Sequence, residues 1–69
     1  MADLTCSAKG CRRPATTAHL WNNPKLHTPE RRKVWLACDE HTVGLGEFLS
    51  VRGFLVETVP ASGIPADAG

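Results

Sequence analysis

The sequence predicts a small α+β domain made of an N-terminal loop, a β-hairpin, one α-helix and a short third strand. Three observations lead to this fold class. The chain has only 69 residues, with 42% hydrophobic and 22% charged, which is typical of a single soluble globular unit. Segments with strand composition precede and follow one segment with helical spacing. Three cysteines supply a means of stabilisation, because a domain of this length buries only about 60% of its unfolded surface and usually needs one.

The predicted hairpin comes from two segments of strand composition in the first half of the chain. Residues 15–21 are rich in Thr and apolar residues and end at Asn22-Asn23-Pro24, which stops a strand. Residues 33–38 form the second strand. The connection is long, and within it residues 28–32 have the signature of one helical turn, with Thr28 as N-cap and Pro29 at the first helical position. We therefore expect an antiparallel hairpin with a long loop.

The helix is expected to follow the second strand directly. Asp39 and Glu40 suit a helix N-terminus because the dipole favours negative charge there, and Gly53 suits a C-cap. Helical spacing is carried by four residues: Leu45, Phe48, Leu49 and Arg52. Glycines within this segment weaken a helix unless they allow a close approach of the backbone; they are Gly44 and Gly46.

Residues 54–59 are expected to form the third strand, which either completes the sheet or pairs with another molecule. Its apolar residues are interpreted as core together with those of the helix: Leu45, Phe48, Leu49, Phe54, Leu55 and Val56. One domain should span residues 4–59. Residues 60–69 are small and contain Pro and Gly, which predicts a flexible C-terminal tail.

The cysteines and one histidine form the strongest motif: Cys6-x4-Cys11, then Cys38-x2-His41. Three cysteines cannot all pair in disulfides, and neither an apolar leader nor an apolar run long enough to span a membrane is present, so we expect a reducing cytoplasm. Clustered cysteines in that compartment more often bind metal or carry out redox chemistry. Cys3His is a common tetrahedral zinc ligand set, so the spacing predicts one structural Zn²⁺ per chain.

The order of knuckle, hairpin and a helix that carries the last ligands resembles the treble-clef zinc fold. Residues 6–15 with residues 38–41 are similar to the Cys-x4-Cys-x2-Pro-Ala … Cys-x2-His pattern of many small bacterial and phage zinc modules. Residues 4–59 also resemble a group of short, mostly uncharacterised actinobacterial proteins, through the segments 21–27, 35–41 and 48–55. Some of that group carry the label "acetone carboxylase". That reaction needs a nucleotide site and a protected metal-activated centre, for which this chain has no space.

Several residues near this motif have more than one interpretation. Each cysteine alone is consistent with a small buried hydrophobe. His19 lies mid-strand and is either a half-buried or solvent-facing imidazole, or a replacement for His41 as fourth ligand. His27 is expected to be solvated. Asp39 either accepts a hydrogen bond from the ring of His41, as metal-bound histidines usually require, or is only a charge at the helix N-terminus.

Charge is distributed unevenly although the net charge is only +1. Residues 1–33 carry a net charge of +5 and residues 34–69 a net charge of −4. The cations either form a patch that contacts phosphates or a partner, or are simply solvated: Lys9, Arg12, Arg13, Lys25, Arg31, Arg32 and Lys33. Trp21 and Trp35 either pack the hairpin core, the interpretation we favour, or are exposed for stacking.

These observations predict a non-enzymatic adaptor that binds a protein partner. The alternative is a nucleic-acid-binding zinc finger that uses the basic N-terminal half. Contacts to either partner would come from six cations: Arg12, Arg13, Lys25, Arg31, Arg32 and Lys33. Four protein ligands leave no open position for a catalytic water, and Cys-x4-Cys is not the redox spacing, so we expect no enzyme, no small-molecule substrate and no membrane contact.

Overall fold

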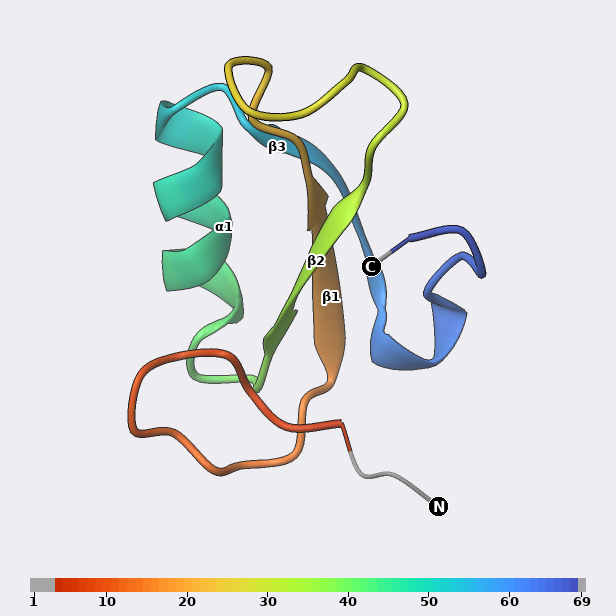
Figure 1. Ribbon diagram of the computed structural model, residues 1–69. Helices are drawn as coiled ribbons and strands as arrows, with labels where there is room; N and C mark the ends of the chain where they lie inside the picture. Colours follow the sequence, from red (N-terminus) through yellow and green to blue (C-terminus); the bar gives the residue numbers. More distant parts are fainter. Residues whose placement is uncertain (1–3, 69) are drawn as a thin grey trace.

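The computed structural model describes residues 4–68 as a three-stranded antiparallel sheet with one helix packed on one face (Figure 1). The expected α+β architecture with an antiparallel hairpin is confirmed. Residues 4–68 contain no helix with the length and apolar character needed to cross a membrane. The elements in chain order are β1 (Thr17–Trp21), β2 (Lys33–Ala37), α1 (Thr42–Val51), β3 (Leu55–Pro60) and the 3₁₀ turn η1 (Ala61–Gly63).

Strand β1 is the centre of the sheet, whose order is β2-β1-β3. On one side β1 pairs with β2, in a register that places His19 opposite Trp35. On its other side β1 pairs with β3, with an irregularity between Leu20 and Trp21. The third strand therefore completes the sheet of its own chain. β1 is paired on both edges, and three of its successive residues are buried: Ala18, His19 and Leu20.

Helix α1 begins later than the acidic residues suggest. Residues 39–41 form a turn, in which the carbonyl of Cys38 accepts hydrogen bonds from the amides of His41 and Thr42, both at 3.0 Å. The Thr42 hydroxyl donates to the same carbonyl at 2.8 Å. Asp39 and Glu40 therefore lie just before the N-terminus of α1 and outside its first turn, because this turn takes up the residues between β2 and the helix.

Helix α1 is terminated by a glycine, as predicted. Gly53 adopts a φ of +72°, which L side chains rarely tolerate. Its amide donates to the Ser50 carbonyl and the Phe54 amide donates to the Leu49 carbonyl, both at 2.9 Å. This pair of bonds is the Schellman motif, and it turns the chain directly into β3.

A buried histidine joins the helix to the sheet. The ring of His19 is only 2% exposed, and its Nδ1 and Nε2 atoms lie 2.8 Å from the Thr58 hydroxyl and the Thr42 carbonyl. A carbonyl only accepts, so Nε2 donates its hydrogen to the Thr42 carbonyl. A Cβ at Gly46 would lie 3.0 Å from Cε1 of this ring, so glycine there allows the close approach that the sequence suggested.

Aromatic side chains fill the space between α1 and the hairpin. Trp21 packs against Trp35 and Phe54, with ring centroids 5.4 and 6.3 Å apart, and Trp35 packs against Phe48 at 5.6 Å. Both tryptophans are half-buried, and the Trp21 indole N–H has no acceptor among the described residues. The prediction of a fully buried apolar set is wrong for Phe48 and Val56, which are 44% and 45% exposed, because the helix covers only part of so small a sheet.

The connection between β1 and β2 is a loop without a helix. At residues 28–32, where one helical turn was predicted, the chain makes a single hydrogen-bonded turn. The Arg31 amide donates to the Thr28 carbonyl at 3.0 Å. The Asn22 side-chain amide donates to the carbonyls of Thr28 and Arg31, at 2.8 and 2.7 Å. Asn22 therefore holds the two ends of the loop together and fixes where β2 begins.

Candidate metal centre

The N-terminal loop between Leu4 and Ala15 is a knuckle that presents two cysteines. An isolated bridge pairs Thr5 with Pro14, and the Cys6 amide donates to the Arg13 carbonyl at 3.0 Å. The tip turns at Gly10, whose φ of +80° suits glycine, and is closed by a 2.9 Å bond from the Cys11 amide to the Ala8 carbonyl. These bonds bring Cys6 and Cys11 to the same side of the loop.

The other two candidate ligands follow strand β2. Cys38 is the first residue after the strand and is 3% exposed. His41 is the residue immediately before α1, and the turn of residues 39–41 directs its ring back toward Cys38, with Nδ1 3.1 Å from the Cys38 sulfur. Strand and helix therefore hold this pair on two rigid elements.

The four side chains converge at one point. All ligand atoms of Cys6, Cys11, Cys38 and His41 lie within 4.8 Å of one another. The Cys6 sulfur is 3.5 Å from His41 Nδ1, and the Cys11 sulfur is 3.8 Å from that of Cys38. A disulfide requires about 2.05 Å between sulfurs, so the three cysteines are free thiols. The cluster can hold one metal ion.

Hydrogen bonding favours the thiolate form at one position of the cluster. Burial alone raises the pKa of the Cys6 thiol, but hydrogen bonds from the Ala8 and Cys38 amides and from the neighbouring thiols outweigh it and lower that pKa from 9.0 to about 6. The Arg13 amide lowers the pKa of Cys11, but burial and the sulfurs of Cys6 and Cys38 raise it more, so its pKa lies above the usual value. A thiolate at Cys6 is the form a metal requires.

His19 lies outside the cluster, and His41 is the histidine within it. Both ring nitrogens of His19 already bond Thr58 and Thr42, so the imidazole has no free ligand atom. The expectation of a half-buried or solvent-facing His19 is wrong, because the helix packs directly over β1 at this residue. His27 is half-buried, with its ring edge toward Trp21.

The two acidic residues beside the cluster have other partners. Asp39 accepts a 2.7 Å hydrogen bond from the Thr16 hydroxyl, which ties the turn to the start of β1. Among the bonds of the described residues, none joins Asp39 to the His41 ring. Glu40 pairs with Arg13 at 2.8 Å across the surface, with both side chains more than 60% exposed. The first contact fastens the turn before α1 to the residue that precedes β1, and the second fastens that turn to the knuckle.

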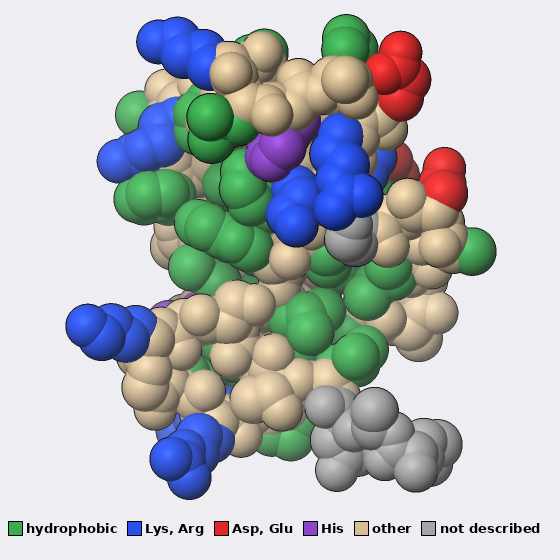
Figure 2. All heavy atoms as spheres, in the orientation of Figure 1, with side chains coloured by type: hydrophobic (Ala, Val, Ile, Leu, Met, Phe, Trp, Pro, Cys, Tyr) green, Lys and Arg blue, Asp and Glu red, His purple; other side chains and the backbone are tan. Residues whose placement is uncertain are grey.

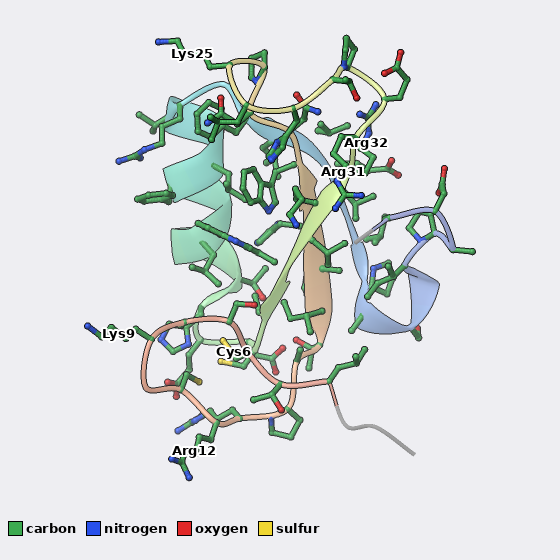
Figure 3. All side chains as sticks on the ribbon, viewed as in Figure 1. Cys6, Lys9, Arg12, Lys25, Arg31 and Arg32 are labelled. Atoms are coloured by element: carbon green, nitrogen blue, oxygen red, sulfur yellow. The ribbon has the colours of Figure 1, made fainter. Side chains whose placement is uncertain are left out.

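The basic side chains form two groups rather than one patch. Figure 3 shows Lys9 and Arg12 on the knuckle, and Lys25, Arg31 and Arg32 at the opposite end of the sheet, on the hairpin loop. The knuckle and the hairpin loop lie at opposite ends of β1 and β2, which explains the separation. Neither spacing nor charge alone indicates this distance, because it depends on the length of the hairpin.

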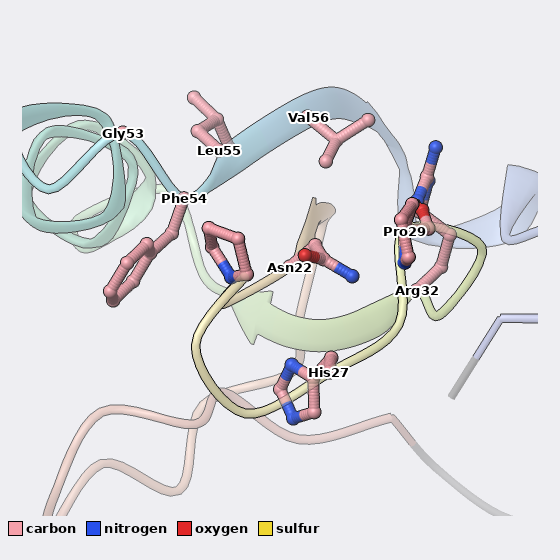
Figure 4. Close-up of a pocket in the computed structure, with 9 residues that line it drawn as sticks. Asn22, His27, Pro29, Arg32, Gly53, Phe54, Leu55 and Val56 are labelled. Atoms are coloured by element: carbon pink, nitrogen blue, oxygen red, sulfur yellow. The ribbon is translucent and has the colours of Figure 1, made fainter.

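A cavity of about 310 Å³ lies at the hairpin-loop end, away from the cysteines (Figure 4). Its polar side chains come from the loop, and its apolar wall comes from the start of β3. The lining residues include Asn22, His27, Arg32, Phe54, Leu55 and Val56. Sequence reasoning did not group these residues, because the Gly53 turn that brings the start of β3 next to the loop is a tertiary feature.

Comparison with protein-family models, with curated proteins and with solved structures finds no match for this chain. The function proposed below is therefore argued from its own residues.

Proposed function

We propose that this chain is a structural-zinc module that acts as a small adaptor for a protein partner. The observation that carries the zinc assignment is the convergence of Cys6, Cys11, Cys38 and His41 from two separate segments. A set of three thiols and one imidazole favours zinc, because magnesium and calcium prefer oxygen ligands.

The separations of the ligand atoms support zinc. Tetrahedral zinc with bonds of about 2.3 Å to sulfur and about 2.0–2.1 Å to nitrogen places two sulfurs about 3.8 Å apart, and sulfur and nitrogen about 3.5 Å apart. The Cys11 and Cys38 sulfurs are 3.8 Å apart, the Cys6 sulfur is 3.5 Å from His41 Nδ1, and the Cys38 sulfur is closer to that nitrogen, at 3.1 Å. Zinc bound here would close the knuckle onto the hairpin and the helix.

The order of elements supports a treble-clef-like assignment. A knuckle supplies the first two ligands, a β-hairpin follows, and the last ligands lie at the end of β2 and just before α1. Because the ligands join segments far apart in the chain, metal binding would contribute directly to folding free energy. With so few buried apolar side chains, this contribution would be decisive for stability.

Native mass spectrometry combined with circular dichroism tests this proposal. We expect one zinc per chain, and loss of the sheet and helix signal when a chelator removes it. Co²⁺ in place of zinc should give the visible absorption of a tetrahedral thiolate site. A metal-free chain that keeps its fold in excess chelator would show that the cysteines are core residues and that the zinc assignment is wrong.

The adaptor function rests on the surface. Residues 1–33 are basic and residues 34–69 acidic, and a surface with both signs suits a protein partner. Nucleic acid is the second candidate, favoured by the Lys9 and Arg12 group and the Arg31 and Arg32 group. Because the two groups lie at opposite ends of the hairpin, a continuous phosphate backbone would contact fewer of these cations at once. Retention on heparin and on polynucleotides across a salt gradient distinguishes the two, since phosphate contacts weaken steeply with salt.

A further inference from the structure

We propose that the groove between the knuckle, Trp35 of β2 and helix α1, together with the adjoining free edge of β2, binds an extended, acidic peptide segment that carries one large apolar side chain. This inference rests on the adaptor function proposed above and specifies its site and its partner. The groove, here called the β2–α1 groove, has a volume of about 310 Å³. Its lining includes Ser7, Lys9, Trp35, Gly44, Leu45 and Phe48.

The backbone of the β2 edge is available for pairing at Val34, whereas Ser7 of the knuckle already occupies the edge at Leu36. In an antiparallel ladder, alternate residues of an edge strand direct their N–H and C=O groups away from the sheet. Leu36 does so, because its amide donates to the Ser7 hydroxyl at 3.0 Å and its carbonyl accepts from the Ser7 amide at 2.7 Å. Val34, two residues earlier, directs the same groups to the same side. Within residues 4–68, no hydrogen bond joins Val34 to a segment beyond β1.

A peptide strand added at this edge would extend the hydrogen bonding that Ser7 makes with Leu36. Peptides often bind by adding a strand to an exposed sheet edge, where backbone bonds supply affinity and pockets select alternate side chains. Successive side chains of such a strand alternate between the two faces of the sheet. Those on the helix side would meet Trp35, Leu45 and Phe48. Gly44 has no side chain, and a Cβ built there meets nothing within 4 Å, so the groove is open at this point.

Positive charge lies on the knuckle at one end of β2 and on the hairpin loop at its other end. Lys9 is on the knuckle and lines the groove, and Arg31 and Arg32 directly precede β2 (Figure 3). The face in Figure 2 shows Lys and Arg side chains above and below a central apolar area, with acidic side chains only at its right margin. A strand of five residues is about 17 Å long. A peptide with acidic residues on both sides of a short apolar stretch therefore matches this edge in length and in charge.

The same residues are poorly suited to stacking bases. The Arg52 guanidinium lies over the Phe48 ring, 3.6 Å from its centroid, and Trp35 packs against both Phe48 and Trp21. The aromatic faces are therefore already in contact with protein. A nucleic acid also lacks the alternating N–H and C=O groups that match the edge at Val34. These two features favour a peptide over a single-stranded nucleic acid.

A phage-displayed library of nonapeptides tests the proposal on the full chain loaded with zinc. The peptides have Asp-Glu and Glu-Asp at their ends and five varied positions between them. A matched library has Lys-Arg at both ends. We expect the acidic library alone to enrich, with a large apolar residue near the middle. In the complex of a selected synthetic peptide, the Val34 amide should exchange its hydrogen more slowly.

Two kinds of variant locate the binding site. Gly44→Leu should fill the groove, because a Cβ at this position would meet nothing within 4 Å, and should weaken the selected peptide by at least about tenfold while the melting temperature stays the same or rises. Val51→Leu on the same helix is the matched control, because Val51 is 84% exposed and lies outside the groove lining, and it should bind as the parent does. Charge reversal at Lys9 and Arg31 to Glu should weaken acidic peptides and admit basic-ended ones.

The outcomes separate this inference from the proposed function. If the folded, zinc-loaded protein enriches no peptide with a Kd below about 1 mM, the groove proposal is wrong, whereas the zinc-module proposal is unaffected. If Gly44→Leu leaves peptide affinity unchanged, the peptide binds at another surface, and the groove proposal is wrong. Oligothymidylate binding that Gly44→Leu abolishes, with no peptide binding, assigns the groove to nucleic acid. A chain that binds no zinc contradicts the proposed function itself.

Discussion

Gly46 of α1 lies directly against the ring of His19 on β1: a Cβ at Gly46 would be 3.0 Å from Cε1 and 3.3 Å from Nε2. The ring cannot move away easily, because Thr58 and Thr42 hold both of its nitrogens. The contact sets the separation of helix and sheet at their centre. It also keeps the N-terminal turn of α1, which follows His41, close to the sheet.

Gly46→Ala should therefore destabilise the protein although alanine favours helices. We expect a loss of about 1–3 kcal/mol from overpacking. Gly44→Ala in the same helix is the control, since its Cβ meets open space and should stabilise by about 0.5–1 kcal/mol. Urea unfolding of the zinc-loaded variants measures both. Equal effects at the two glycines would show that the His19 contact does not limit the packing.

Substitution of the two histidines should have different consequences for zinc. His41→Ala removes a candidate ligand and should lower both zinc binding and folding. His19→Gln should keep one zinc per chain and lose about 1–3 kcal/mol, because the Thr42 carbonyl or the Thr58 hydroxyl is left poorly bonded. Zinc stoichiometry by native mass spectrometry and unfolding by urea give the two readings. Loss of zinc from the His19 variant alone would reverse the assignment.

Stability should fall as the pH is lowered from about 9 to about 6. The folded chain lowers the pKa of Cys6 to about 6, whereas an unfolded thiol titrates near 9.0. The contribution of this thiolate is therefore complete above pH 9, declines as the pH falls through the window, and is absent below about pH 6. Zinc binding acts in the same direction because it requires the thiolate. Urea midpoints of the zinc-loaded chain, measured at constant ionic strength, should decrease on acidification, and an increase would contradict this.

The ion pair between Arg13 and Glu40 should contribute little. Both side chains are more than 60% exposed, and exposed pairs typically contribute about 0.2–1 kcal/mol. Arg13→Ala should lower the unfolding free energy by no more than this amount, with the effect disappearing in high salt. A larger, salt-independent loss would indicate that Arg13 supports the knuckle by packing rather than by charge.

The hairpin, the helix and the grouping of the candidate ligands were predictable because each has a local signal. Strand composition, helical spacing and paired cysteine spacing are properties of short segments, and the structure has elements at all three places. The glycine at the helix end was predictable for the same reason, since Gly53 adopts the positive φ that a C-cap requires.

Features that depend on packing between distant segments could not be predicted. No local pattern in residues 54–59 indicates whether this strand pairs with β1 or with β2. The burial of His19 depends on that pairing, because it makes β1 the central strand. Asp39 bonds Thr16 because the sheet brings residues 23 positions apart into contact. The exposure of Phe48 depends on how far one short helix extends over the sheet.

The central place of β1 has a consequence for the order in which the molecule is made. All four candidate ligands and both strands of the hairpin precede α1 and β3 in the chain, so they are synthesised before the strand that pairs with the second edge of β1. The residues from α1 to β3 follow within seconds at ordinary rates of synthesis. Capture of zinc by the nascent chain would hold β1 in place as a template, onto which β3 adds last.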